Sequence, residues 1–135
     1  MTEEALLRKQ LVDSYKLTSV LGLNEASTGN LSCRFGEGML ISPSGANAES
    51  ITSESVVFVD ADGNFSGVKS PSTEWHMHAA IYRDHDKAKA VVHTHSDHCV
   101  ALASHNRALP GFHYMVGFFG GTDVPCVPYS TFGTE

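Results

Sequence analysis

The sequence predicts a single α/β domain in which helices pack against a sheet of short strands. Two segments show the apolar periodicity of helices, and four short apolar runs bounded by turn residues have the composition of strands. A chain of 135 residues, 41% of them hydrophobic, is long enough for one core of ordinary size. This mixture favours an α/β sandwich over a helical bundle or a barrel, with one domain spanning residues 1–135.

The first predicted helix covers Glu3–Leu21. Leu7, Leu11 and Tyr15 follow one another at fourfold spacing and share one face. Acidic residues open the segment, where the helix dipole favours negative charge, and Gly22 is a typical helix end.

The remaining predicted elements alternate between strands and helices. Short runs of apolar residues predict strands at Leu31–Phe35, Met39–Ser42, Val56–Val59 and Ala90–Val92. Helices are predicted at Glu74–Arg83, where Trp75, His78, Ala79 and Tyr82 share one side, and at Cys99–Ala103. The tail Gly117–Glu135 is rich in Gly, Pro, Ser and Thr, and we expect either an irregular final strand or the front part of a longer protein.

Charge and hydropathy exclude two classes of partner. Nine basic against fifteen acidic residues give a net charge of −6, and no basic stretch offers a footprint for nucleic acid. No apolar run approaches the roughly 20 residues needed to span a bilayer, and the acidic start is unlike a signal peptide. Three widely separated cysteines fit neither a disulfide framework nor a zinc site made of paired thiolates. We therefore expect a cytoplasmic protein with no membrane association.

Histidines concentrate in the middle of the chain, and two of them form the pattern His93-Thr94-His95 directly after an apolar run. Side chains two apart on a strand point to the same face, roughly 6.5 Å from each other, so both imidazoles can reach one metal ion. The alternative is that they are polar residues at a strand end that bond to backbone. The apolar run favours the metal interpretation, and the other histidines are expected to be mostly structural or solvent-facing.

Glu74 begins the second predicted helix and has two possible roles. A carboxylate there can simply favour the helix dipole. If a metal lies nearby, Glu74 becomes a candidate general base, since partial burial beside a side chain such as Trp75 can raise a carboxyl pKa while the cation stabilises the charge that proton removal creates.

Three segments combine small hydroxyl residues with Gly, Pro or Asn: Ser27–Asn30, Ser42–Gly45 and Ser70–Thr73. Each alone is typical of a turn or a cap. Together they could surround a phosphate with backbone N–H groups and hydroxyls, without clustered Lys or Arg. Tyr114, in an aromatic and glycine-rich region, is either a proton donor near the reacting oxygen or a packing residue.

These motifs occur in an order that resembles the class II aldolase/adducin family over essentially the whole chain. The residues that carry the resemblance are Gly22-Leu23-Asn24, Ser27-Thr28-Gly29-Asn30-Leu31-Ser32, Ile41-Ser42-Pro43-Ser44-Gly45, Ser70-Pro71-Ser72-Thr73-Glu74-Trp75, Val91-Val92-His93-Thr94-His95 and Thr131-Phe132-Gly133-Thr134.

The resemblance implies an α/β/α sandwich enzyme, commonly a homotetramer, that uses Zn²⁺ or another divalent transition metal to cleave a phosphorylated ketose into dihydroxyacetone phosphate and an aldehyde. It implies that His93 and His95 are metal ligands and that Glu74 is the acid/base. Tyr114 matches an aromatic proton donor at a subunit boundary. The implied substrate-binding residues are Ser27, Asn30, Ser44, Gly45, Ser72 and Thr73 around the phosphate, with Phe132 as a neighbouring apolar contact.

The family's third metal-binding histidine lies in a later segment, so the resemblance also implies that these residues are the N-terminal portion of a longer domain. His98 and His113 are the alternatives within the chain. Two other functions remain open. One is a sugar-phosphate epimerase or dehydratase with the same enediolate chemistry, although epimerases of the family carry Asp where this chain has Glu74. The other is a non-catalytic interaction module like the adducin heads.

Overall fold

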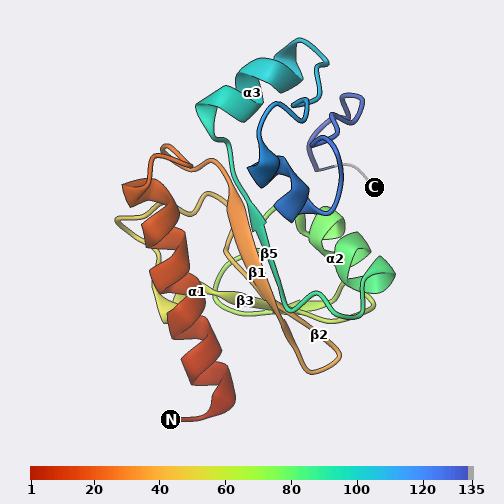
Figure 1. The fold of residues 1–135 in the computed structure, drawn as a ribbon. Coiled ribbons are helices and arrows are strands. Elements are labelled where there is room, and N and C mark those ends of the chain that lie inside the picture. The colour runs from red at the N-terminus through yellow and green to blue at the C-terminus, as the bar shows by residue number, and fades with distance from the viewer. Residues whose placement is uncertain (134–135) are drawn as a thin grey trace.

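The computed structural model describes residues 1–133 and places two long helices on opposite sides of a five-stranded sheet (Figure 1). A third helix lies beyond the end of the last strand. In chain order the elements are α1 (Glu3–Val20), β1 (Asn30–Phe35), β2 (Gly38–Ile41), the 3-10 helix η1 (Ser53–Ser55), β3 (Val57–Val59), β4 (Phe65–Ser66), α2 (Trp75–Asp84), β5 (Ala90–His93), α3 (Asp97–Ser104) and the 3-10 helix η2 (Tyr114–Phe119).

The strands pair in the order β4-β3-β2-β1-β5, and every pair is antiparallel. β1 lies between its neighbour in sequence, β2, and β5, which comes from far along the chain. Ser32 pairs with Ile41 on one side, and Asn30 pairs with His93 on the other. This register sets the start of β1 directly beside the end of β5.

Each face of the sheet buries its own set of side chains, because successive residues of a strand point to opposite faces. Leu11 and Tyr15 of α1 pack with Leu31 and Leu40 on one face. On the other face Tyr82 of α2 packs with apolar residues of β2 and β3. Full burial of such a side chain contributes about 1.5–3 kcal/mol. The predicted order of helix, sheet and helix is therefore confirmed.

The ends of α1 follow the sequence signals. The Thr2 side chain caps the first turn by accepting a hydrogen bond from the Ala5 N–H at 3.2 Å, and Glu3 and Glu4 lie in that turn. Gly22 follows the helix with φ +67°, a conformation that favours glycine. The predicted termination near Gly22 is thus confirmed.

Other elements differ from the prediction in their bounds. The strand expected from Val56 begins at Val57, because Val56 ends the unpredicted η1. α2 begins one residue later than predicted, with Glu74 at its N-cap. In the tail from Gly117, η2 ends at Phe119, Val124 forms an isolated bridge with Leu109, and no further strand occurs up to residue 133; Thr134 and Glu135 lie outside the described residues. In residues 1–133 no helix combines the length and the apolar character that a bilayer crossing requires.

Candidate active site

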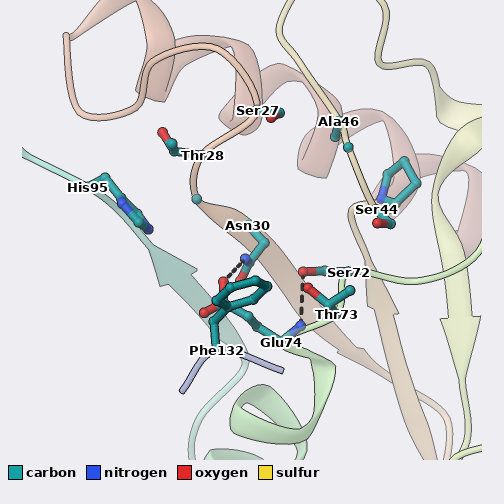
Figure 2. A pocket seen from close by; sticks show the side chains of 13 residues that line it. Ser27, Thr28, Asn30, Ser44, Ala46, Ser72, Thr73, Glu74, His95 and Phe132 are labelled. Atoms are coloured by element: carbon teal, nitrogen blue, oxygen red, sulfur yellow. Dashed lines mark hydrogen bonds between the residues drawn. The ribbon is translucent and has the colours of Figure 1, made fainter. Parts of the chain in front are cut away.

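The three hydroxyl-rich segments meet around one cavity of about 280 Å³ at the N-terminal end of α2 (Figure 2). It is bounded by the loop before β1, the loop after β2, the loop before α2 and the segment just after β5. The lining residues are Ser27, Thr28, Gly29, Asn30, Pro43, Ser44, Gly45, Ala46, Ser72, Thr73, Glu74, His95 and Phe132. Every predicted substrate-binding residue is among them.

Backbone hydrogen bonds join two of these loops. The Ser44 N–H donates to the Ser70 carbonyl at 3.0 Å, and the Ser72 N–H donates to the Ser42 carbonyl at 3.1 Å. The buried Ser42 hydroxyl also accepts from the Leu31 N–H at 3.1 Å, which connects the loops to β1. The hydroxyl and glycine residues are therefore held in fixed positions around the cavity.

Glu74 is half-buried, and one oxygen of its side chain makes contacts with two neighbouring groups. Oε2 accepts from Asn30 Nδ2 at 2.7 Å and lies 3.1 Å from His93 Nδ1. The Glu74 side chain makes no capping hydrogen bond to α2, while its own N–H donates to the Ser72 hydroxyl at 3.3 Å. Its partners are thus groups of the site rather than the end of the helix.

The rings of His93 and His95 lie side by side, with centroids 4.9 Å apart and planes inclined by 43°. The His95 backbone N–H donates to Asn24 Oδ1 at 2.9 Å, so backbone bonding fixes the strand end without using the imidazoles. Burial lowers the pKa of His93, an effect that His95 reinforces and Glu74 opposes. A neutral imidazole is the form that binds a metal.

This donor set fits a divalent transition metal at two ligand positions. His93 Nδ1 faces Glu74 Oε2 and lies 3.3 Å from Asn30 Oδ1; both oxygens accept hydrogen bonds. The ring therefore carries its proton on Nδ1, which leaves the Nε2 lone pair for a metal. In residues 1–133 no group of three or more His, Cys, Asp or Glu side chains is arranged to hold an ion.

The structure does not bring every predicted residue to the cavity. Tyr114 in η2 is 77% exposed, lies outside the lining and stacks on His113, with ring centroids 4.5 Å apart. His113 Nδ1 accepts from the Met115 N–H at 3.2 Å, and His98 lies exposed in the first turn of α3. Neither alternative third ligand is part of a three-residue metal group in the described chain.

Two residues around the site carry roles that the sequence did not predict. Buried Asn24 donates to the Thr18 hydroxyl at 3.2 Å besides accepting from His95, so it links the end of α1 to the end of β5. His78 is completely buried and bonds to Asn30 and Ser32. The signal for His78 was its place on the same side of the predicted helix as Ala79 and Tyr82.

The α/β/α sandwich thus brings a carboxylate, two adjacent imidazoles and three hydroxyl-rich loops together at one place. The chain belongs to the family of class II aldolase and adducin N-terminal domains, whose model matches residues 9–135. The family predicted from the sequence motifs is therefore confirmed.

Individual relatives agree with this assignment. The chain is 43% identical to L-fuculose phosphate aldolase of Escherichia coli (strain K12) over 133 residues, which cover 98% of this chain and 62% of that protein. It is also 43% identical to a 5-methylthioribulose-1-phosphate/5-deoxyribulose-1-phosphate aldolase of Rhodospirillum rubrum, over 95% of this chain and 58% of that protein. A solved L-fuculose 1-phosphate aldolase superposes with a TM-score of 0.91 at 31% identity, over 100% of this chain and 64% of that chain. The chain thus spans about three fifths of these relatives.

Proposed function

We propose that this chain carries the donor-binding and acid/base part of a class II aldolase, which cleaves a ketose 1-phosphate into dihydroxyacetone phosphate and an aldehyde. The observation that carries the proposal is the Glu74 carboxylate, which Asn30 and His93 hold through one oxygen in the wall of a cavity otherwise rich in hydroxyls and glycine. The relatives are aldolases of phosphorylated ketoses by name, which supports the same chemistry.

The phosphate would lie among the three loops. Ser27, Ser44, Ser72 and Thr73 supply hydroxyls, and Gly45 lets the backbone approach closely. The cavity also lies at the N-terminal end of α2, where backbone N–H groups and the helix dipole favour an anion. The lining contains no Lys or Arg, so the phosphate would be bound by hydroxyls, backbone N–H groups and the helix dipole. These groups can bind a phosphate even in a chain with a net charge of −6. Fixing the phosphate orients the donor half of the sugar.

Glu74 moves the proton at the reacting carbon. In the cleavage direction the hydroxyl of the aldehyde half gives its proton through Tyr114 to water, the carbon–carbon bond breaks and its electron pair stays with the donor half as an enediolate. Glu74, protonated from solvent, then gives that proton to the carbon to form dihydroxyacetone phosphate; addition runs the same steps backwards. Because Oε2 is held by Asn30 and His93, Oε1 is the oxygen that faces the exchange.

His93 and His95 would hold a divalent transition metal, for which we propose zinc. Bound there, the ion would polarise the oxygens of the donor half and stabilise negative charge on them. A catalytic zinc site takes three protein ligands, and the resemblance assigns the third to a later segment of longer family members.

Tyr114 is the proposed group for the proton on the aldehyde oxygen. Its exposure on η2 agrees with a position at a subunit boundary, and we propose a cytoplasmic homotetramer on the family resemblance. Phe132, which lines the cavity and is 72% exposed, would contact the substrate's apolar surface.

Release of dihydroxyacetone phosphate tests the reaction. The purified chain, supplied with Zn²⁺, is assayed with L-fuculose 1-phosphate and with 5-deoxyribulose 1-phosphate. We expect release from one or both, and a chelator should abolish it. An epimerase would convert substrate without releasing dihydroxyacetone phosphate. An interaction module would neither convert substrate nor release product, and either result contradicts the proposal.

Glu74→Gln and His93→Ala separate the roles of base and ligand. Glu74→Gln should lower turnover by about 10²–10⁴-fold, because the amide cannot exchange the proton, and should leave bound zinc unchanged. His93→Ala should lose both turnover and zinc. The measurements are initial rates and metal content on the same preparations. Normal activity of Glu74→Gln would show that another group is the base.

A further inference from the structure

A continuous series of buried hydrogen bonds leads from the core between α2 and the sheet to Glu74. The Tyr82 hydroxyl lies 2.8 Å from Ser32 Oγ, which lies 2.7 Å from His78 Nδ1. His78 Nε2 contacts Asn30 Oδ1, and Asn30 Nδ2 donates to Glu74 Oε2 at 2.7 Å. His78 has no exposed surface, and Ser32 and Asn30 are 2% and 5% exposed.

The chemistry of the end group fixes the direction of every bond. An ionised carboxylate only accepts, so the NH₂ group of Asn30 must face Glu74. The other end of that amide is an acceptor, so His78 must carry its proton on Nε2 and donate. Its unprotonated Nδ1 then accepts from the Ser32 hydroxyl, which in turn accepts from Tyr82. No bond in the series can be reversed without a clash of two acceptors or two donors.

Burial keeps the ring in the neutral state that this arrangement requires. Desolvation lowers the pKa of His78 to about 4, the charge of His93 acts in the same direction, and Glu74 opposes both. At neutral pH the ring therefore has one donor nitrogen and one acceptor nitrogen.

We propose that His78 is a positioning residue whose Nε2–H fixes the Asn30 amide so that the amide NH₂ holds Oε2 of Glu74. His78 lines no part of the cavity and acts only through Asn30. Without this donor, Asn30 Oδ1 would keep only the 3.3 Å contact with His93 Nδ1, and the amide could rotate and release Glu74. The catalytic consequence rests on the proposed function, whereas the hydrogen-bond arrangement does not.

Nitrogen-15 NMR of the 135-residue chain tests the arrangement without substrate or metal. Histidines are labelled, and the His78 ring is assigned by its loss in His78→Gln. We expect the neutral tautomer protonated on Nε2 at pH 7. A ring protonated on Nδ1, or a charged ring, overturns the proposal.

Two substitutions then test the step from His78 to Asn30. His78→Leu removes the donor at similar volume, and the Asn30 side-chain amide protons should exchange with water at least tenfold faster. His78→Gln places an amide donor near the former Nε2 and should restore slow exchange to within about threefold. Tyr82→Phe is the control, because it perturbs the same core but leaves the bond between Ser32 and His78 in place; Asn30 exchange should not change. Equal exchange in wild type and His78→Leu contradicts the proposal.

Turnover supplies the last readout. If the proposed aldolase reaction is observed, His78→Leu should lower kcat about 10–100-fold with a smaller change in KM, and His78→Gln should recover part of it. An unchanged kcat in His78→Leu overturns the positioning role. Absence of aldolase activity in the wild type refutes the proposed function alone, since the tautomer and the Asn30 exchange are measured independently.

Discussion

Asn30 connects the imidazoles of His78 and His93 to Glu74. Its Oδ1 lies against rings from two different elements, His78 in α2 and His93 in β5, while its NH₂ group holds the carboxylate. The residue can do this because it begins β1 directly opposite His93 in the sheet register. One amide of β1 therefore contacts a ring of α2, a ring of β5 and the carboxylate of the N-cap residue of α2.

Replacing that amide by a carboxylate of the same shape should destabilise the fold. Asn30→Asp places two buried acceptors against each other where Asn30 Nδ2 now donates to Glu74, and we expect a loss of about 2–4 kcal/mol in the free energy of unfolding. Urea denaturation at pH 7 measures it. Asn47→Asp is the matched control, because Asn47 uses its Oδ1 to accept from the N–H groups of Glu49 and Ser50, which Asp can also do. Equal stability of the two variants would contradict the assigned bonds.

His78 should make stability depend on pH in mildly acidic solution. Its pKa is about 4 in the fold and 6.5 when unfolded, so between these values the unfolded chain binds more protons. The contribution of neutral His78 to the free energy of unfolding is complete above pH 6.5. It is lost as the pH falls towards 4, which lowers the free energy of unfolding by up to about 3 kcal/mol. Urea denaturation across this range should show that the free energy of unfolding falls less steeply with decreasing pH in His78→Gln than in the wild type. Part of the pH dependence remains in the variant because the pKa of His93 is lowered too. His85→Gln, at an exposed position, should keep the full slope.

At the scale of elements, the loop from α1 to β1 depends on one close approach. Gly29 has φ +70°, and a Cβ there would lie 2.3 Å from the side-chain amide of Asn24. That amide joins Thr18 at the end of α1 to the His95 backbone at the end of β5. The loop therefore couples a helix on one face of the sheet to the end of β5 and the residues just after it, which carry the two proposed metal ligands.

Gly29→Ala should be much more costly than the same change at Gly22. Both residues have positive φ, which costs an alanine about 1–2 kcal/mol, but a Cβ added to Gly22 would have no neighbouring atom within 4 Å. We expect Gly22→Ala to lose only that amount and Gly29→Ala to lose about 2 kcal/mol more as Asn24 is displaced. Urea denaturation compares the two. Similar losses would show that Asn24 moves aside freely.

Local signals in the sequence allowed the three α-helices and four of the five strands in residues 1–133 to be predicted, and the family resemblance predicted most of the lining residues. Periodicity identified α1, and the alternation of His93 and His95 after an apolar run located the end of β5. The hydrogen-bond partners of His78 could not be predicted, since they depend on β1 and α2 meeting although the bonded residues are 46 and 48 positions apart in sequence. Similarly, nothing local to Tyr114 indicates whether it reaches a cavity in its own chain.

At the scale of the whole molecule, the cavity lies where the sheet and both helical layers are connected. Tyr15 of α1 donates its hydroxyl to the Ala46 carbonyl at 2.8 Å, so the helix on one face supports the loop after β2. α2, on the other face, begins at the loop that ends with Glu74. A ligand that occupies the cavity should therefore raise the free energy of global unfolding and not only stabilise the loops.

Inorganic phosphate should stabilise the folded chain by binding this cavity. A ligand that binds only the folded state adds RT ln(1 + [L]/Kd), or about 2.7 kcal/mol at 100 times Kd. Urea denaturation at increasing phosphate, with ionic strength held constant by NaCl, should show this rise for the wild type. Ser44→Asp should abolish it, because a carboxylate in the lining repels the anion. Ser66→Asp adds the same charge at an exposed position on β4, outside the lining, and should keep the rise. If both variants respond alike, the phosphate binds elsewhere and the three loops do not form its site.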